Sequence, residues 1–295
     1  LLLPANAAIK LSLWLHVLLG YLGEYRLARL LGVTPAGAAI AGMSVALGGG
    51  IALHMTTGHV AHVIALGLAP WVFVCVVQAC RRPGLASMAA FALIVSLLFL
   101  VGHPQVPYYT LLFAGLWTIG SLACGSAAVH RLRVVLSLGA GLIVGGMIGA
   151  VQILPTLELL RETAGATPRG TAEYAAAYDL APIDLARQWL PTAGGNPFIG
   201  QPEFQPPDFM HEKVCYPVLP VWVLAIAPFL STLPRGFREE ASSLAGGAER
   251  SLTTWQVRGL AGLIGLGFVI ALGDGTPCWT CAGTLLPGLH LFRCP

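Results

Sequence analysis

Apolar runs about as long as a bilayer is thick recur along this chain, separated by short clusters of glycine, proline and arginine. A helix needs about 20 apolar residues to cross the hydrocarbon core of a membrane. Only 10% of the 295 residues are charged and 56% are hydrophobic, whereas soluble domains carry about 25% charged residues. The pattern therefore predicts an all-α fold, a polytopic transmembrane helix bundle whose first partner is the lipid bilayer. The same arithmetic, with a net charge of only +3, excludes a disordered chain and a nucleic-acid binder.

Apolar periodicity bounded by Gly, Pro or charge predicts about eight spans, which form one membrane domain over residues 1–295. The predicted spans are Leu11–Leu31, Ala36–Thr56, His59–Cys80, Leu85–Gly102, Val106–Cys124, Val134–Leu154, Val214–Leu233 and Val257–Leu272.

Arginine placement predicts which side of the membrane each loop occupies. Ten of the 16 cations fall on alternate loops that share one side, and nine of the 13 acids fall on the other side. Because cytoplasmic loops are enriched in Lys and Arg, the first side is expected to be cytoplasmic. The cations of that side are Arg26, Arg29, Arg81, Arg82, Arg131, Arg133, Arg235, Arg238, Arg250 and Arg258.

One large extracytoplasmic loop is predicted over residues 155–213. It holds too many prolines for a long helix, although Pro182–Leu190 has the pattern of a short helix lying on the membrane surface. Long loops in compact proteins are usually functional, so part of a site is expected here. Residues 234–254, rich in Gly, Ser and mixed charge, are expected to form a cytoplasmic linker.

Small residues mark two of the predicted spans. Gly141, Gly145 and Gly149 recur every four residues, a spacing that lets two helix backbones approach closely in lipid. The run Gly48-Gly49-Gly50 has either the same packing role or marks a local break in the second span.

The histidines are distributed unevenly. Seven of the eight lie at or near the predicted outer end: His16, His54, His59, His62, His103, His211 and His290. Ionisable groups near membrane depth are functional candidates. His59 and His62 are three residues apart, so they could share a metal or a phosphate. The sequence does not supply the further ligands that zinc requires, so hydrogen-bonded interface histidines, an anion contact and a metal site all stay open.

Carboxylates on the outer side supply the remaining candidate chemistry, because the chain holds no nucleophile elbow, nucleotide loop or zinc-protease motif. Glu158 and Arg161 are one helical turn apart, and a solvated surface pair competes with a site role. Glu212 lies between His211 and Lys213 just before a predicted span. An acid, a base and an imidazole at a membrane mouth would need a ligand to compensate their desolvation.

Several short motifs, in order along nearly the whole chain, resemble the YfhO-type family of bacterial membrane proteins, which belong to the GT-C superfamily of polytopic glycosyltransferases. They are Trp14-Leu15-His16 with Tyr25–Gly32, Gly102-His103-Pro104-Gln105, Gln152–Glu158, Tyr178–Pro182 with Gly195-Asn196-Pro197, Tyr216–Pro220, and Leu286–Leu289 with Leu291-Phe292-Arg293. The sequence departs from the family at Pro217, where the family usually has glycine.

The resemblance implies an enzyme of the bacterial inner membrane that moves a sugar from a polyprenyl-phosphate donor to a cell-envelope acceptor on the extracytoplasmic face. Cations and imidazoles would stabilise the phosphate leaving group, and a carboxylate would deprotonate the acceptor. A divalent metal stays possible. The expected substrate contacts are His59, His103, Gln105, Gln152, Arg161, Asp179, Asn196 and Arg293, and Glu158 and Glu212 are expected to assist catalysis.

The chain begins with Leu1 and stops in a predicted loop, so we expect a fragment. In the family, the first span and the outer loop carrying the main catalytic acid would precede Leu1, and this stretch alone is then expected to be inactive. A non-catalytic transporter or lipid translocase is the alternative. Transporters tend to have repeated halves and paired broken helices, and the sequence shows neither.

Overall fold

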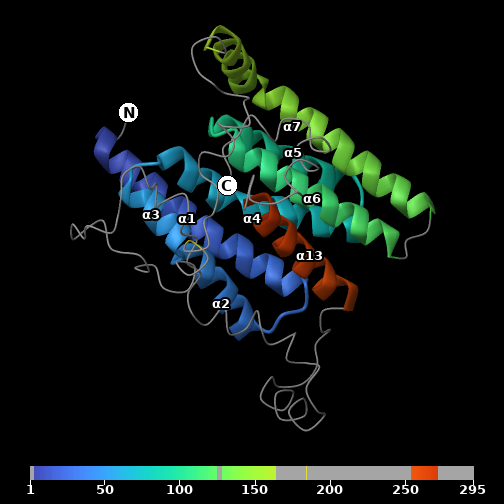
Figure 1. Ribbon diagram of the computed structural model, residues 1–295. Helices are drawn as coiled ribbons and strands as arrows, with labels where there is room; N and C mark the ends of the chain where they lie inside the picture. The colour runs from blue at the N-terminus through green and yellow to red at the C-terminus, as the bar shows by residue number, and fades with distance from the viewer. Residues whose placement is uncertain (1–2, 125–127, 164–183, 185–253, 272–295) are drawn as a thin grey trace.

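The computed structural model describes residues 3–124, 128–163, 184 and 254–271, and all the regular structure in these ranges is helical (Figure 1). The helices are α1 (Ala5–Leu30), α2 (Pro35–Ala46), α3 (Gly49–Thr56), α4 (Val60–Arg81), α5 (Leu85–Leu100), α6 (Gln105–Ala123), α7 (Ala128–Thr163) and α13 (Thr254–Ala271). Within these ranges five helices are long and apolar enough to cross a membrane, counting α2 with α3 as one, and α5 is a shorter apolar helix. The chain is a multi-pass membrane protein. The predicted span Val214–Leu233 and residues 234–253 of the predicted linker lie outside the described residues.

The surface of the bundle is strongly apolar. Met147 and Val151 on α7 are 73% and 71% exposed, and Trp14 on α1 is 66% exposed. Soluble monomers rarely expose contiguous apolar patches of this kind. Such side chains are stable when lipid surrounds them, which fits the composition.

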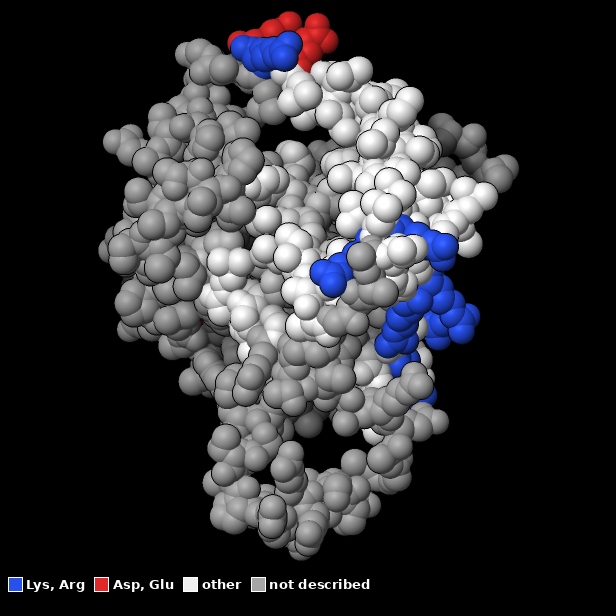
Figure 2. Space-filling view, turned by 90° about the vertical axis from the view of Figure 1, so that its right-hand side faces the viewer, with Lys and Arg blue, Asp and Glu red and all other residues white. Residues whose placement is uncertain are grey.

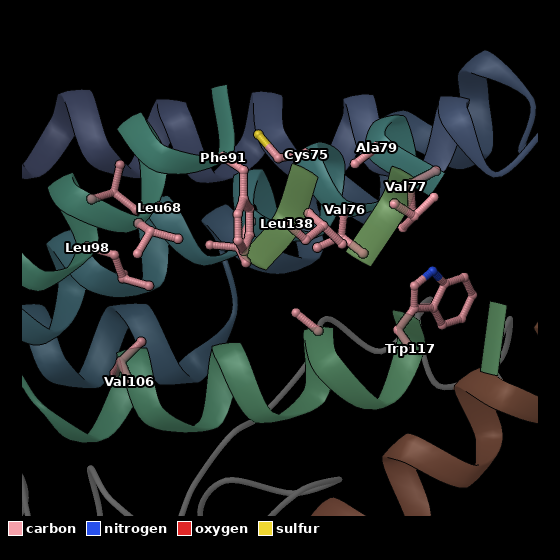
Figure 3. Packing of buried hydrophobic residues seen from close by; sticks show 14 of the residues in the cluster. Leu68, Cys75, Val76, Val77, Ala79, Phe91, Leu98, Val106, Trp117 and Leu138 are labelled. Atoms are coloured by element: carbon pink, nitrogen blue, oxygen red, sulfur yellow. The ribbon is translucent and has the colours of Figure 1, made fainter. Parts of the chain in front are cut away.

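Helix α4 lies at the centre of the described bundle and packs against α1, α5, α6 and α7. Val72, Val76 and Ala79 of this helix are almost completely buried. Figure 3 shows residues of α4 beside side chains of α5, α6 and α7. The labelled members are Leu68, Cys75, Val76, Val77, Ala79, Phe91, Leu98, Val106, Trp117 and Leu138.

Small residues bring α1 and α4 close together. A Cβ atom added to Gly20 would lie 3.3 Å from the Cα atom of Gly67. One turn further along α4, the indole nitrogen of Trp71 donates a hydrogen bond of 2.9 Å to the carbonyl oxygen of Leu19. Such a bond is available because the two backbones approach so closely.

The glycine repeat of α7 faces α5. A Cβ atom at Gly141 would lie 2.9 Å from the Met88 carbonyl oxygen, and one at Gly145 would lie 2.7 Å from the Ala92 carbonyl oxygen. At Gly149 the added atom would lie 2.8 Å from Phe99. The packing role predicted for the repeat is therefore confirmed.

The second predicted span, Ala36–Thr56, is not one continuous helix. Helix α2 ends at Ala46, and Gly48 adopts an extended backbone (φ −65°, ψ 149°) before α3 begins at Gly49. Glycine is a poor helix former because it loses the most backbone freedom. The run Gly48-Gly49-Gly50 therefore marks a local break in the span, which is one of the two roles that the sequence left open.

The prediction that the sixth helix ends at Leu154 and that the outer loop begins at 155 is wrong. Helix α7 continues through Pro155 to Thr163. Pro155 has no amide proton to donate to the carbonyl oxygen of Val151, one turn earlier. Beside it, the hydroxyl of Thr156 donates 2.8 Å to the carbonyl oxygen of Gln152.

Three arginine-bearing helix ends meet at one end of the bundle. The Arg81 guanidinium, at the end of α4, donates to the carbonyl oxygen of Leu30 at the end of α1. The Nε2 atom of His130, near the start of α7, lies 2.8 Å from the Cys80 carbonyl oxygen. In Figure 2, the larger group of basic side chains lies well away from the acidic ones at the top. These contacts place together loops that the arginine pattern assigns to one side.

Candidate functional site

Four imidazoles lie ring to ring at the opposite end of the bundle, and we call them the histidine cluster: His54, His59, His62 and His103. The rings of His54 and His62 stack with centroids 3.8 Å apart and an interplanar angle of 6°. The ring of His59 lies 5.5 Å from that of His54. The ring of His103 meets that of His62 edge-on at 4.6 Å.

Two glycine turns assemble the histidine cluster. Gly58, with φ +80°, reverses the chain between α3 and α4, and the His59 amide donates 2.9 Å to the His54 carbonyl oxygen. Gly102, with φ +76°, ends the turn after α5 and places His103 before α6. Glycine adopts this left-handed backbone without the steric cost that a side chain adds. Residues from two helices and two turns therefore converge.

The hydrogen bonds restrict where the ring protons lie. The Nδ1 atom of His54 is 2.7 Å from the Gly50 carbonyl oxygen, which can only accept, so this nitrogen carries the proton. The Nδ1 atom of His62 is 3.1 Å from the Nε2 atom of His103, and one proton lies between these two nitrogens. The ring protonation state of each histidine thus affects its neighbour.

Electrostatics favour the neutral form of His103. Burial lowers the pKa of this imidazole below its usual range, and the nearby His59 lowers it further. Its Nδ1 atom is buried and has no hydrogen-bond partner within the part of the chain that the structure describes. A ring nitrogen of this kind is a polar group that a local rearrangement or a bound ligand would satisfy.

Helix α7 reaches the same site through Gln152. A Cβ atom at Gly102 would lie 3.2 Å from the Nε2 atom of Gln152, so the amide group lies against this turn. The same Nε2 atom donates 3.4 Å to the Thr156 hydroxyl oxygen. The site thus combines imidazoles with a carboxamide, groups that donate and accept hydrogen bonds without a fixed charge.

The structure brings together part of the predicted site. His59, His103 and Gln152 lie in or beside the cluster, and Gln105 begins α6 two residues after His103. Glu158 and Arg161 are exposed on the last turns of α7, and within that described helix no ion pair joins them. They are helical residues, which corrects their predicted place in a loop. The other predicted site residues lie outside the described residues: Asp179, Asn196, Glu212 and Arg293.

The sequence interpretation grouped His54 and His62 with the outer histidines and considered a metal or phosphate shared by His59 and His62, but its substrate contacts included neither His54 nor His62. His54 is buried, 6% exposed, and stacks on His62. The available signal was the spacing of His54, His59 and His62 around Gly58, which can fold two of these rings onto each other.

Within the described ranges, no group of three or more His, Cys, Asp or Glu side chains is arranged to hold a metal ion. Ring stacking between His54 and His62 directs their faces, not their lone pairs, at each other.

No family profile, curated protein or solved structure matches the chain.

Proposed function

We propose that this chain is a GT-C-like bacterial inner-membrane glycosyltransferase, in which the histidine cluster binds the phosphate of a polyprenyl-phosphate sugar on the extracytoplasmic side. The observation that carries the proposal is the convergence of four imidazoles and Gln152 at the end of the bundle opposite the arginine-bearing ends. The resemblance to YfhO-type proteins adds the expected donor and acceptor. We also propose that the whole chain has the eight spans that the sequence predicts.

The chemistry suits a phosphate leaving group. When the bond between the sugar carbon and the phosphate oxygen breaks, negative charge grows on that oxygen. Imidazole N–H donors and the Gln152 amide stabilise such charge without requiring a general acid. The acceptor hydroxyl must also lose a proton. Glu158 is exposed on α7 and could only assist a carboxylate supplied from elsewhere.

Photo-crosslinking tests where the donor binds. The protein in proteoliposomes would be irradiated with a photoreactive polyprenyl-phosphate analogue, and the labelled peptides would be mapped by mass spectrometry. We expect label in residues 54–62 and 102–105, competed by polyprenyl phosphate but not by the uncharged polyprenol. Substituting His130→Asn, on the opposite end, is the matched control and should leave the labelling unchanged. Label confined to the arginine-bearing end would refute the proposal.

A transporter or lipid translocase is the second candidate, and the break between α2 and α3 favours it. Broken helices within spans are a feature of transporter sites, and this span is interrupted at Leu47 and Gly48. Movement of a fluorescent polyprenyl-phosphate across the bilayer of proteoliposomes would favour this candidate. Sugar transfer to an acceptor without such movement would favour the enzyme.

A further inference from the structure

Glu24 is an acidic residue within α1, a candidate membrane span, and it lies away from the histidine cluster. Positions 20, 24 and 28 fall on one stripe of the helix because they are four residues apart. Gly20 and Ala28, on either side of it along this stripe, are both buried, and Glu24 itself is half-buried. The carboxyl group therefore lies on the face that α1 turns toward its neighbours.

The neighbours on that face are α2 and α4. A Cβ atom at Gly20 would lie 3.3 Å both from the Gly67 Cα atom of α4 and from the Val45 side chain of α2. A Cβ atom at Gly23 would lie 2.8 Å from the indole nitrogen of Trp71 and 3.1 Å from the Cβ atom of Pro70, both on α4. Glu24 is one turn beyond Gly20, so it lies along the junction of α1, α2 and α4.

No hydrogen bond or ion pair to the Glu24 carboxyl forms within the residues that the structure describes. The ionisable groups of the packed elements are few. On α1 these are the stacked Tyr21 and Tyr25 and, near the helix end, Arg26 and Arg29; α2 has none over Pro35–Ala46. In the half of α4 that ends at Arg81, the ionisable residues are Cys75, Cys80 and Arg81. The Arg81 guanidinium donates to the Leu30 carbonyl oxygen.

Glu24 lies near the inner end of the candidate span. It precedes the helix end at Leu30 by six residues, a rise of about 9 Å, and it precedes Arg26, the first cation assigned to the cytoplasmic side, by two residues. Acidic residues inside membrane spans are rare and mark proton relays or substrate paths, because an unpaired charge is unfavourable in hydrocarbon. A neutral carboxylic acid avoids that penalty, and it can lose and regain its proton when the local environment changes.

We propose that Glu24 is a proton-binding site within the membrane, at the junction of α1, α2 and α4. The proton adds to a carboxylate oxygen to give the neutral acid, and it comes from water at the arginine-bearing end, which lies nearest. No other bond changes. The site is independent of the histidine cluster and of the proposed sugar transfer.

A hydrophobic carbodiimide tests the proposal, because this reagent adds to protonated carboxyl groups from the apolar phase and leaves a stable acylurea. The protein in lipid nanodiscs would be treated with dicyclohexylcarbodiimide or with a water-soluble carbodiimide, and the modified residues would be mapped by mass spectrometry. We expect the hydrophobic reagent to label Glu24 at neutral pH and the water-soluble reagent to label Glu158 and Glu162 instead. Labelling of Glu24 should fall about tenfold per pH unit above its midpoint.

The variants Glu24→Gln and Glu158→Gln serve as matched controls for the peptide assignment. Because the labelling is measured on the unmodified sequence, the test stands even where a variant folds poorly. Absence of label at Glu24 in the folded protein would overturn the proposal. Labelling by the water-soluble reagent at the rate found for Glu158 would overturn it as well, since the carboxyl would then lie in water.

Discussion

The closest packing between α5 and α7 occurs at Gly145, and substituting this residue should destabilise the bundle. A Cβ atom there would lie 2.7 Å from the Ala92 carbonyl oxygen and 2.9 Å from the Val95 side chain. One of these neighbours is backbone, so it cannot rotate away. The substitution Gly145→Ala therefore forces the two helices apart.

Gly146 provides a matched control one residue along the same helix. A Cβ atom at this position meets no atom within 4 Å. Replacing glycine by alanine favours the helix by about 1 kcal/mol in either position, so this contribution cancels when the two variants are compared. The difference between Gly145→Ala and Gly146→Ala is then the packing penalty, about 1–3 kcal/mol for overfilling a tight interface.

The free energy of unfolding of both variants would be measured by reversible denaturation in mixed micelles. We expect Gly146→Ala to be as stable as the wild type or more so, and Gly145→Ala to be less stable than Gly146→Ala by the amount above. Equal stabilities of the two variants would refute the close approach of α5 and α7.

Three other predictions concern the ends of the bundle. The folded state holds the pKa of His103 below its usual value, so the unfolded state binds a proton more readily. The free energy of unfolding should therefore fall as the pH drops below about 6.5. The thermal midpoint should lose this pH dependence in His103→Asn but keep it in His130→Asn. In a cysteine-free background, cysteine at Thr57 should react with an impermeant thiol reagent added outside, and cysteine at Arg82 only with reagent added inside; the reverse pattern would invert the topology. The Thr34 hydroxyl accepts 3.2 Å from the Gly37 amide at the start of α2, so Thr34→Ala should cost about 1 kcal/mol of unfolding free energy, and Thr34→Ser should restore most of it.

Features of the fold that depend on local pattern could be predicted from the sequence. Apolar runs located α1, α4, α5, α6, most of α7, and α13, since span length is set by the bilayer and the flanking charges are explicit. The glycine repeat predicted a packing face because its spacing alone places three small residues on one side of a helix. The sequence does not show that this face packs against α5, since the pairing of two helices depends on how the bundle folds.

The errors have physical causes. The sequence pattern places a helix end before Pro155 because apolar runs are bounded by proline there, yet α7 continues past this residue to Thr163. The pairing of His62 with His103 could not be predicted, because it depends on a contact across 41 positions of the chain. Tertiary contacts of this length are not encoded in local spacing.

Equilibrium binding of polyprenyl phosphate tests the central claim most directly, with polyprenol as the uncharged comparison ligand. A hydrogen bond to a charged group contributes about 1.5–3 kcal/mol, so His62→Asn should weaken polyprenyl-phosphate binding by about tenfold or more and leave polyprenol binding unchanged. The control His130→Asn should bind both ligands as the wild type does. Equal affinity of the wild type for the phosphate and the alcohol, or unchanged phosphate binding in a folded His62→Asn protein, would contradict the assignment of the histidine cluster as the donor site.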